Sequence, residues 1–343
     1  MVTIADIAEK TGSSIAAVSL ALNGKPGVGA ELRERILAEA ESLGYRRLRR
    51  RSRVVKILHV SKHGRILNAQ HKGFIADYLD GVQYEAGRSG LVIDLRFLEG
   101  LSAQSLESAL EPGGAEGLVV LGTELDRGDL EEISRLGLPK VFIDAYYPDL
   151  DLDFVDMDNT RALYDIVGYL WELGHRDLGL VVGKIASPNF RLRELAFAEA
   201  YSALAGSAVP GAARIAVDTT YDGAYEDMRS FLRKRRPLPT ALVCVNDVVA
   251  LGAMKALKES GRRVPEDISI VGFDNIDLGA VSEPPLTTYE VSKREIGRRA
   301  LKLLLERMED REFLHSEKVT IGGGLVRRSS ACAPGGEAPP RGA

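Results

Sequence analysis

Short runs of β-branched and aliphatic residues alternate with helical stretches along most of this 343-residue chain. Seven such runs are candidate strands, at 54–60, 91–95, 118–121, 141–143, 178–182, 241–245 and 268–273. Regular alternation of this kind is typical of parallel sheets covered by helices on both faces. About 280 residues take part, which is enough chain to bury two cores. We therefore predict an α/β domain made of two doubly wound parallel-sheet sub-domains.

Polar residues stand at the ends of three of these candidate strands. Asp144 ends VFID, Asn246 and Asp247 end CVND, and Asp274 ends VGFD. In open α/β sheets ligands bind beyond the carboxyl ends of the strands, so these side chains are candidates for a ligand site. A strand-end aspartate more commonly caps the next helix, and Asp247 is expected to be such a cap.

The first 24 residues have a different pattern, that of two short helices joined by a glycine turn. Thr3 can cap the first helix with Asp6 as its capping-box partner, and Ser14 can cap the second. The apolar residues recur at helical spacing and are expected to point inward: Ile4, Ile7, Ala8, Val18, Ala21 and Leu22. The outer face of the second helix carries Ala16, Ser19, Leu20 and Asn23. So small a pair suits the major groove of DNA, although a generic helical hairpin has the same periodicity.

A third helix is expected at 31–43, and the arginine-rich run RRLRRRSR follows it at 46–53. Residues 1–56 carry 11 Lys and Arg against 6 Asp and Glu, whereas the rest of the chain carries 34 against 43. A basic N-terminal segment followed by an acidic remainder is typical of a nucleic-acid-binding protein that has a second domain for another partner. A solvated linker is the alternative explanation of the run, but its place directly after a helix-turn-helix favours phosphate contact.

These motifs together resemble the lactose-repressor (LacI/GalR) family of bacterial transcriptional regulators. The similar segments are VTIADIAEKTG, VSLALNGKPGV, the LGY ending of the third helix, LGHRDLGLVVG, residues 241–279 and PPLTTYEVSKREIGRRA, in the family's order. The resemblance spans nearly all of residues 2–330. It implies a helix-turn-helix headpiece and a periplasmic-binding-protein-like effector domain. It also implies a cytoplasmic homodimer on a palindromic double-stranded DNA operator, controlled by a small-molecule effector, by default a sugar or sugar derivative.

The expected domain boundaries follow from this resemblance. They are 1–45 for the headpiece, 46–56 for a basic hinge, 57–330 for the effector domain and 331–343 for a disordered tail. Within the effector domain, the N-sub-domain is expected at 57–157 and 291–317, and the C-sub-domain at 158–288 and 318–330. The family's optional leucine-heptad segment does not follow, so a dimer is expected rather than a tetramer.

The resemblance also implies which side chains contact DNA: Thr3, Ser14, Ile15, Ala16, Ser19, Leu20, Asn23, Leu48, Arg49 and Arg50. Two departures from the family bear on this site. The outer face of the second helix has no long side chain that could donate hydrogen bonds to guanine. We therefore expect its apolar residues to contact thymine methyl groups and its small polar residues to contact phosphates. The hinge is shorter than usual by roughly seven residues, and Leu48 is its only apolar candidate for a minor-groove wedge.

The effector site that the resemblance implies comprises Phe74, Asp144, Arg193, Asn246 and Asp274, with Tyr221 as a further stacking candidate. The forked donors of Arg193 suit hydroxyls or a carboxylate, and Asp274 can accept hydrogen bonds from a sugar-like ligand.

The loop at 61–73 departs from the family, because it is longer than usual and lacks the Asn-Pro pair that precedes the aromatic residue. It carries His63, Asn68, His71 and Lys72. These are either plain loop residues or part of the effector site, and the sequence leaves both alternatives open.

Two other classes of protein share this kind of fold. A secreted sugar-binding protein needs a signal peptide, and MVTIADIAEK has no apolar core segment. A sugar-acting enzyme needs a catalytic constellation, but the chain has no GxGxxG after a strand, no P-loop and no HExxH, and its histidines lack metal-ligand spacing. Two distant cysteines fit a reducing compartment, and no apolar stretch is long enough to span a membrane. We therefore expect no enzyme activity, no cofactor, no metal and no membrane partner.

Overall fold

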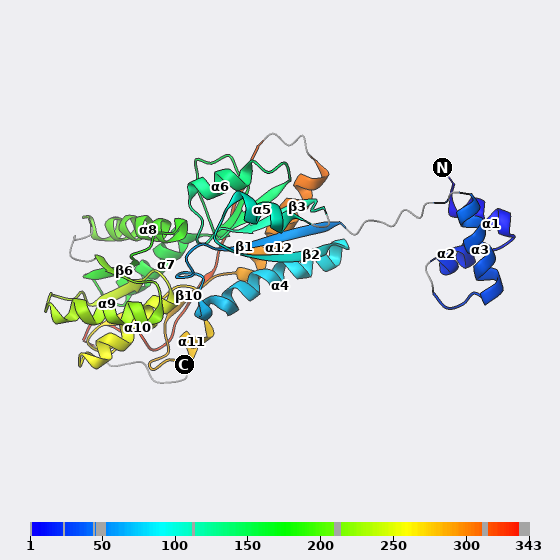
Figure 1. Cartoon of the computed structure of the whole chain (residues 1–343). Coiled ribbons are helices and arrows are strands. Elements are labelled where there is room, and N and C mark those ends of the chain that lie inside the picture. The colour runs from blue at the N-terminus through cyan, green and yellow to red at the C-terminus, as the bar shows by residue number, and fades with distance from the viewer. Residues whose placement is uncertain are drawn as a thin grey trace. The chain divides into compact units, whose positions relative to one another are not determined.

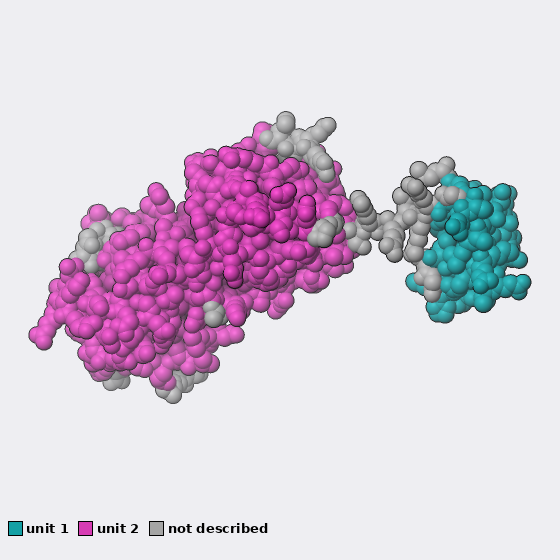
Figure 2. All heavy atoms as spheres, in the orientation of Figure 1, with its two compact units in different colours: residues 1–52 teal, residues 53–343 magenta. Residues whose placement is uncertain are grey.

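The structure, a computed structural model, describes residues 2–22, 25–43, 45, 53–111, 114–208, 214–310 and 315–335. The chain forms two compact units, residues 1–52 and residues 53–343 (Figures 1 and 2). The expected hinge at 46–56 therefore extends too far, because its last four residues belong to the second unit and the first strand of that unit already begins at Val54.

The first unit consists of three helices, α1 (Ile4–Thr11), α2 (Ile15–Leu22) and α3 (Ala30–Ser42). Thr3 and Asp6 form the predicted capping box on α1, which ends at Gly12 in the left-handed conformation, φ 62°. Ser14 Oγ accepts the Ala17 N–H at 3.1 Å, so the predicted second cap is also present. The buried core contains Ile7, Ala8, Val18, Ala21, Ile36 and Ala40.

The N-sub-domain of the second unit contains a six-stranded parallel sheet. Its strands, in spatial order, are β11 (Lys318–Ile321), β5 (Phe154–Met157), β4 (Lys140–Ile143), β3 (Gly117–Leu121), β1 (Val54–Ser61) and β2 (Val92–Glu99). The helices that cover it are α4 (Lys72–Ser89), α12 (Lys293–Glu309), α5 (Ala103–Leu110) and α6 (Arg127–Ser134).

The two faces of this sheet are covered by different helices because successive strand residues point in opposite directions. Val119 and Leu121 belong to the core beneath α4 and α12. Leu118 and Val120 belong to a second core beneath α5 and α6. Figure 1 shows α4 and α12 side by side.

The C-sub-domain contains a four-stranded parallel sheet. Its strands, in spatial order, are β7 (Arg214–Val217), β6 (Leu178–Gly183), β8 (Ala241–Cys244) and β9 (Ser269–Val271). The helices are α7 (Asn159–Glu172), α8 (Pro188–Ala205), α9 (Tyr221–Arg233), α10 (Asp247–Glu259) and the short α11 (Asp277–Ala280). Figure 1 shows α7 and α8 together on one side of the sheet and α9 and α10 on the other. The predicted doubly wound α/β fold class is confirmed.

Five strands were not predicted from the sequence. They are β5, β7, β11 and the antiparallel pair β10 (Thr288–Glu290) and β12 (Gly324–Val326). Because β11 pairs with β5, residues 318–321 belong to the N-sub-domain, and the expected boundary after residue 317 was placed too early.

The body of the second unit also extends beyond the expected end at residue 330. Ala331 and Cys332 are buried, and the Cys332 N–H donates to Ser269 Oγ at 3.1 Å. The Cys332 carbonyl oxygen lies 2.8 Å from His175 Nε2. Residues 331 and 332 are therefore part of the C-sub-domain core rather than of a tail, and residues 336–343 lie outside the described part of the chain.

Candidate functional site

The helix α2 presents the predicted DNA-contacting face. Ile15 is 59% exposed at the start of the helix, and Ala16 beside it is also exposed. Ser19 and Leu20 are half-buried. The helix, IAAVSLAL, carries no Lys, Arg, Asn or Gln, so its outer face offers mainly apolar contact to a groove.

The remaining predicted DNA contacts fall into two groups. Thr3 and Ser14 are exposed at the starts of α1 and α2, but both hydroxyls already serve as helix caps. Four predicted contacts lie outside the described residues: Asn23, Leu48, Arg49 and Arg50.

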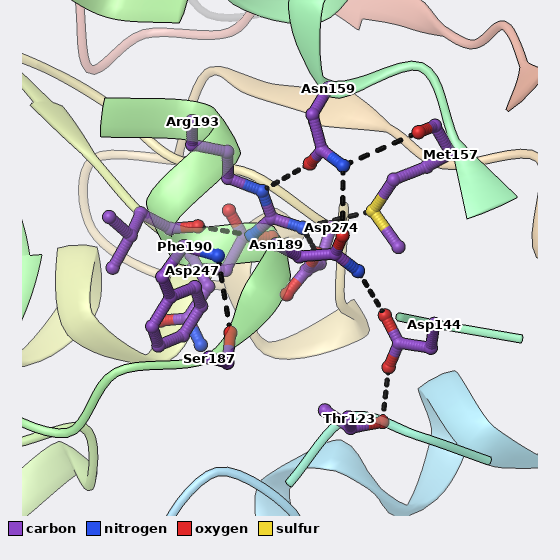
Figure 3. Close-up of polar contacts among 12 residues, drawn as sticks. Thr123, Asp144, Met157, Asn159, Ser187, Asn189, Phe190, Arg193, Asp247 and Asp274 are labelled. Carbon is purple, nitrogen blue, oxygen red and sulfur yellow. Dashed lines mark hydrogen bonds and ion pairs between the residues drawn. The ribbon is translucent and has the colours of Figure 1, made fainter. Parts of the chain in front are cut away.

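In the second unit, Arg193 on α8 is the centre of a buried polar cluster (Figure 3). The side chain is 3% exposed, and its Nε donates to Asn159 Oδ1 at 2.9 Å. A terminal nitrogen donates to Met157 Sδ at 2.9 Å and lies 3.8 Å from Asp274 Oδ1. The guanidinium carbon is 3.6 Å from the centroid of the Phe273 ring. The cluster therefore joins the end of β5 in one sub-domain to the ends of α7, α8 and β9 in the other.

Asp144 and Asn189 form a second link between the sub-domains (Figure 3). Asp144 follows β4 with φ 55°, a conformation that aspartate tolerates better than most residues. It accepts hydrogen bonds from Thr123 Oγ1 and from Asn189 Nδ2, the latter at 2.8 Å. The same Asn189 nitrogen donates to Asp156 Oδ1 at 3.3 Å. Asn189 precedes Arg193 by one helical turn, so both side chains lie on one face of α8.

Phe74 lies on α4 beside this cluster, where the resemblance placed it. Its ring is 7% exposed and meets the Tyr78 ring edge-on at 5.1 Å between centroids. It also meets the His71 ring edge-on at 6.4 Å, and Lys293 Nζ lies 5.3 Å from its centroid.

The 62–71 loop is held by a single buried carboxylate, that of Glu124. The two oxygens of Glu124 accept five backbone N–H groups, from Lys62, His63, Gly64, Ile66 and Leu67, at 2.8–3.0 Å. Charged acceptors make strong hydrogen bonds with backbone donors, so one side chain fixes most of the loop. These bonds lower the pKa of Glu124 although its burial acts to raise it.

Of the loop residues that the sequence left open, His71 enters the site. It is 4% exposed, and its Nε2 lies 3.2 Å from Asn246 Nδ2 and 3.9 Å from Asp274 Oδ2. Asn246 Oδ1 accepts the Val249 N–H, which directs the amide nitrogen at His71. His71 Nε2 is therefore an acceptor, and its Nδ1 donates to Asn68 Oδ1 at 3.1 Å.

Of the other three open residues, Asn68 is the hydrogen-bond partner of His71, and His63 and Lys72 stay outside the cluster. His63 Nδ1 pairs with Glu124 Oε1 at 3.1 Å, and Lys72 is exposed at the start of α4. In addition to the contacts of His71, the loop contacts the C-sub-domain at a second place. Arg65 forms an ion pair with Asp218 at 2.8 Å, and its carbonyl oxygen accepts from Thr219 Oγ1 at 3.0 Å.

The expected cap on α10 was assigned to the wrong residue. Asn246 has extended backbone, φ −157°, and its side chain caps the helix. Asp247 already lies inside the helix, where its two carboxylate oxygens accept from Thr288 Oγ1 at 2.6 Å and from the Ile276 N–H at 2.9 Å. Asp247 therefore ties α10 to the segment after β9 and to the first residue of β10.

Tyr221 is placed away from Arg193. It begins α9 and lines a separate pocket of about 500 Å³ together with Gln70, Leu251 and Met254. Lys255 Nζ lies 5.8 Å from its ring centroid. The predicted stacking role of Tyr221 thus gains no support from its position.

Burial dominates the ionisation of this cluster. It raises the pKa of Asp274 to about 8, although the Arg193 guanidinium beside it acts in the opposite direction. It also raises the pKa values of Asp144 and Asp156, and it lowers the pKa of His71 to about 4. Neutral forms of these groups are favoured because a charged form loses its hydration inside the protein.

Replacing Asp274 with asparagine is expected to change how stability depends on pH. Between pH 5 and pH 7 the folded wild type keeps the Asp274 proton that the unfolded chain has lost, so this group makes the folded state less stable as pH rises. The stability of Asp274→Asn relative to wild type should therefore increase from pH 5 to pH 7. Urea unfolding at several pH values measures it, and a constant difference would contradict the prediction. His71 titrates in both proteins and cancels in the difference.

The sequence reasoning missed several members of the cluster: Tyr78, Glu124, Asp156, Asn159 and Asn189. Two of them had a usable signal. Asn189 stands four residues before Arg193, and Tyr78 stands four residues after Phe74, so each shares a helix face with a predicted site residue. Asp156 stands inside the apolar run of β5, where a buried carboxylate is unusual.

Two further searches bear on the chemistry of the site. Over the described ranges, no three His, Cys, Asp or Glu side chains are grouped as metal ligands would be. The same residues include no helix with the length and apolarity to cross a bilayer. The site consists of hydrogen-bonding and charged groups arranged between two sub-domains, which suits the binding of a polar small molecule.

Comparison with known proteins agrees with this arrangement. Residues 3–47 match the bacterial regulatory proteins of the lacI family, and residues 167–331 match the periplasmic binding protein-like domain. The transcriptional repressor CytR of Escherichia coli is 30% identical over 97% of both chains. The transcriptional repressor PurR of Haemophilus influenzae is 30% identical, with 96% of this chain and 98% of the relative covered.

Solved structures are similar over nearly the full length. The transcriptional regulator CelR in complex with cellobiose has a TM-score of 0.71 at 26% identity, covering 96% of this chain and 100% of the other. The lac repressor dimer bound to operator and an anti-inducer has a TM-score of 0.73 at 24% identity, covering 97% and 99%, which shows the shared fold. The chain therefore belongs to the lacI family of bacterial regulatory proteins, and it is a DNA-binding transcriptional repressor with a periplasmic-binding-protein-like domain, not an enzyme.

Proposed function

We propose that a sugar or sugar derivative, bound between the two sub-domains of the second unit, controls the affinity of this repressor for its DNA. The observation that carries the proposal is the cluster around Arg193, which takes side chains from both sub-domains. A ligand that contacts these groups stabilises one relative placement of the sub-domains over another, and that preference is all that coupling to DNA binding requires.

The solved relatives support the class of effector and the mode of assembly. CelR was solved with cellobiose, and the lac repressor was solved as a dimer on its operator. By analogy, two copies of this chain form a two-fold dimer that places two headpieces on a palindromic DNA site. In each headpiece, Ile15 and Ala16 of α2 contact thymine methyls, and small polar residues contact phosphates.

A sugar that binds the site is expected to stabilise the second unit against heat. At about 100 times its dissociation constant the gain is about 2.7 kcal/mol, which a thermal-shift screen of sugars detects. Asp274→Ala should abolish the shift. Asp277→Ala, at an exposed position three residues further on, is the matched control and should retain it. A full shift in Asp274→Ala would contradict the site, and absence of any shift would contradict the effector class.

The arginine run is expected to make DNA binding strongly dependent on salt. Six or more neutralised phosphates would lower the affinity roughly 10³–10⁵-fold between 50 and 200 mM salt. Replacing Arg49, Arg50 and Arg51 with alanine should flatten the plot of log affinity against log salt by about 0.9 for each lost contact. Fluorescence anisotropy measures both. The control replaces Arg233, Lys234 and Arg235, three exposed basic residues of the second unit, with alanine, and it should keep the wild-type slope. An unchanged slope in the first variant would exclude phosphate contact by the run.

A further inference from the structure

The 62–71 loop is anchored to the N-sub-domain at its first half. The Glu124 carboxylate accepts five backbone N–H groups of the loop. The Lys62 ammonium donates to Asp126 at 2.6 Å and to Asp129 at 2.7 Å, both at the start of α6. Charge-assisted hydrogen bonds of this number fix the backbone of so short a segment. The loop therefore moves with the N-sub-domain as one body.

The part of the C-sub-domain that the loop meets is a turn held by its own contacts. Asp218 follows β7, and its Oδ1 accepts the Thr220 N–H at 2.9 Å and the Thr220 hydroxyl at 2.7 Å. The Asp218 N–H donates to Asp227 Oδ2 at 2.7 Å. Thr219 is fully buried, and a Cβ on Gly183 at the end of β6 would lie only 2.7 Å from Thr219 Cγ2. The turn is therefore a firm seat for the loop.

The loop contacts the C-sub-domain at three separate places. Arg65 pairs with Asp218 at 2.8 Å, and its carbonyl oxygen accepts the Thr219 hydroxyl at 3.0 Å. Gln70 lines the same pocket as side chains of α9 and α10. His71 contacts the side chain that caps α10. We call residues 62–71 the strap, because they are fixed in one sub-domain and reach several elements of the other.

The strap bears on access to the polar cluster. Arg193 is 3% exposed, Asp274 and His71 are 4% exposed, and Asn246 is 1% exposed. A ligand can therefore contact these side chains only after the two sub-domains have separated. Separation breaks the strap contacts, because each of them joins one sub-domain to the other.

We propose that the strap holds the two sub-domains together in the effector-free protein and sets how strongly the joined arrangement is favoured. An effector that enters the cluster has to offset the free energy of the strap contacts, so the strap sets the threshold for the response. This role does not depend on the chemical class of the effector, and it goes beyond the proposed function.

Two of the strap contacts can be removed independently. Arg65→Ala removes the ion pair with Asp218, and it keeps the carbonyl oxygen that Thr219 binds. The pair is partly exposed, so its loss should raise the ratio of separated to joined sub-domains about two- to fivefold. Thr219→Val removes the buried hydroxyl donor at nearly constant shape, and it should raise the ratio about fivefold. Both changes together should raise it about tenfold or more.

The test measures the distance between the sub-domains of the full chain by double electron–electron resonance, with no sugar present. Spin labels are attached to Ser108→Cys on α5 and to Ser230→Cys on α9, two exposed positions. Cys244 and Cys332 are buried. Labelled chains are diluted in unlabelled chains, so that both labels of a measured pair belong to one chain. The wild type should give one main distance. The combined variant Arg65→Ala with Thr219→Val should give a second distance, about tenfold more populated than in the wild type.

Arg161→Ala is the matched control, because Arg161 pairs with Asp165 at the same distance of 2.8 Å but within the single helix α7. It should keep the wild-type distribution of distances. High salt screens an exposed ion pair, so 0.5 M salt should populate the second distance more in the wild type than in Arg65→Ala.

Each outcome decides for or against the strap. An unchanged distribution in the combined variant would overturn the proposal, and so would a wild type that already divides evenly between two distances. An equal shift in Arg161→Ala would remove the assignment to the strap. If the combined variant does not fold, Arg65→Ala decides alone, since Arg65 is exposed. The thermal-shift screen tests the proposed function separately, so either proposal can fail while the other stands.

Discussion

Replacing Arg193 with alanine is expected to lower the free energy of unfolding of the second unit by about 3–5 kcal/mol. The guanidinium is buried and supplies donors to Asn159, to the Val245 carbonyl oxygen and to Met157. Its removal takes the Arg193 donors from these acceptors and the guanidinium, 3.8 Å away, from the Asp274 carboxyl group. The space that it occupied against Phe273 becomes a cavity.

Arg191→Ala is the matched control, because Arg191 is exposed two residues earlier on the same helix. Its effect should stay within about 0.5 kcal/mol. Urea unfolding followed by circular dichroism measures both variants. Equal stabilities of the two variants would show that the Arg193 contacts do not hold the sub-domains together.

Replacing Glu124 with glutamine is expected to lower the free energy of unfolding by about 3 kcal/mol and to loosen the 62–71 loop. The amide that replaces one carboxylate oxygen is a donor, and it would face backbone N–H groups that are donors too. Hydrogen exchange of residues 62–67 should become faster, because their amides lose a charged acceptor. His71 should then lose its fixed place beside Asn246.

Glu107→Gln on α5 is the control for this variant, since Glu107 is exposed on the same sub-domain. It should leave both the unfolding free energy and the exchange rates of the loop unchanged. Exchange rates in Glu124→Gln that match those of the wild type would mean that other contacts fix the loop.

The sequence predicted those parts of the fold that depend on local pattern. The helix caps at Thr3 and Ser14 and all seven candidate strands are present, because hydrogen-bonding side chains and apolar periodicity act over a few residues. The strand β5 was missed because Asp156 interrupts its apolar run, and β11 was missed because its pairing with β5 joins segments far apart in the chain.

The candidate site shows the same division. The positions of Arg193, Asp274 and Phe74 followed from the resemblance, and the structure gathers them in one cluster. The role of His71 was left open by the sequence, since it depends on how Glu124 holds the backbone of the loop. The bridge through Asn189 was missed as well, because it exists only once the two sub-domains face each other.

The pairing of β11 with β5 has a consequence for synthesis of the protein. The sheet of the N-sub-domain begins at Val54, but its last strand ends at Ile321, and the helix α12 that covers it comes from the same late segment. A nascent chain on the ribosome therefore exposes an unfinished strand edge and apolar surface until nearly all of the second unit has been translated. Truncation anywhere before residue 321 removes part of the earliest sub-domain, not only of the latest one.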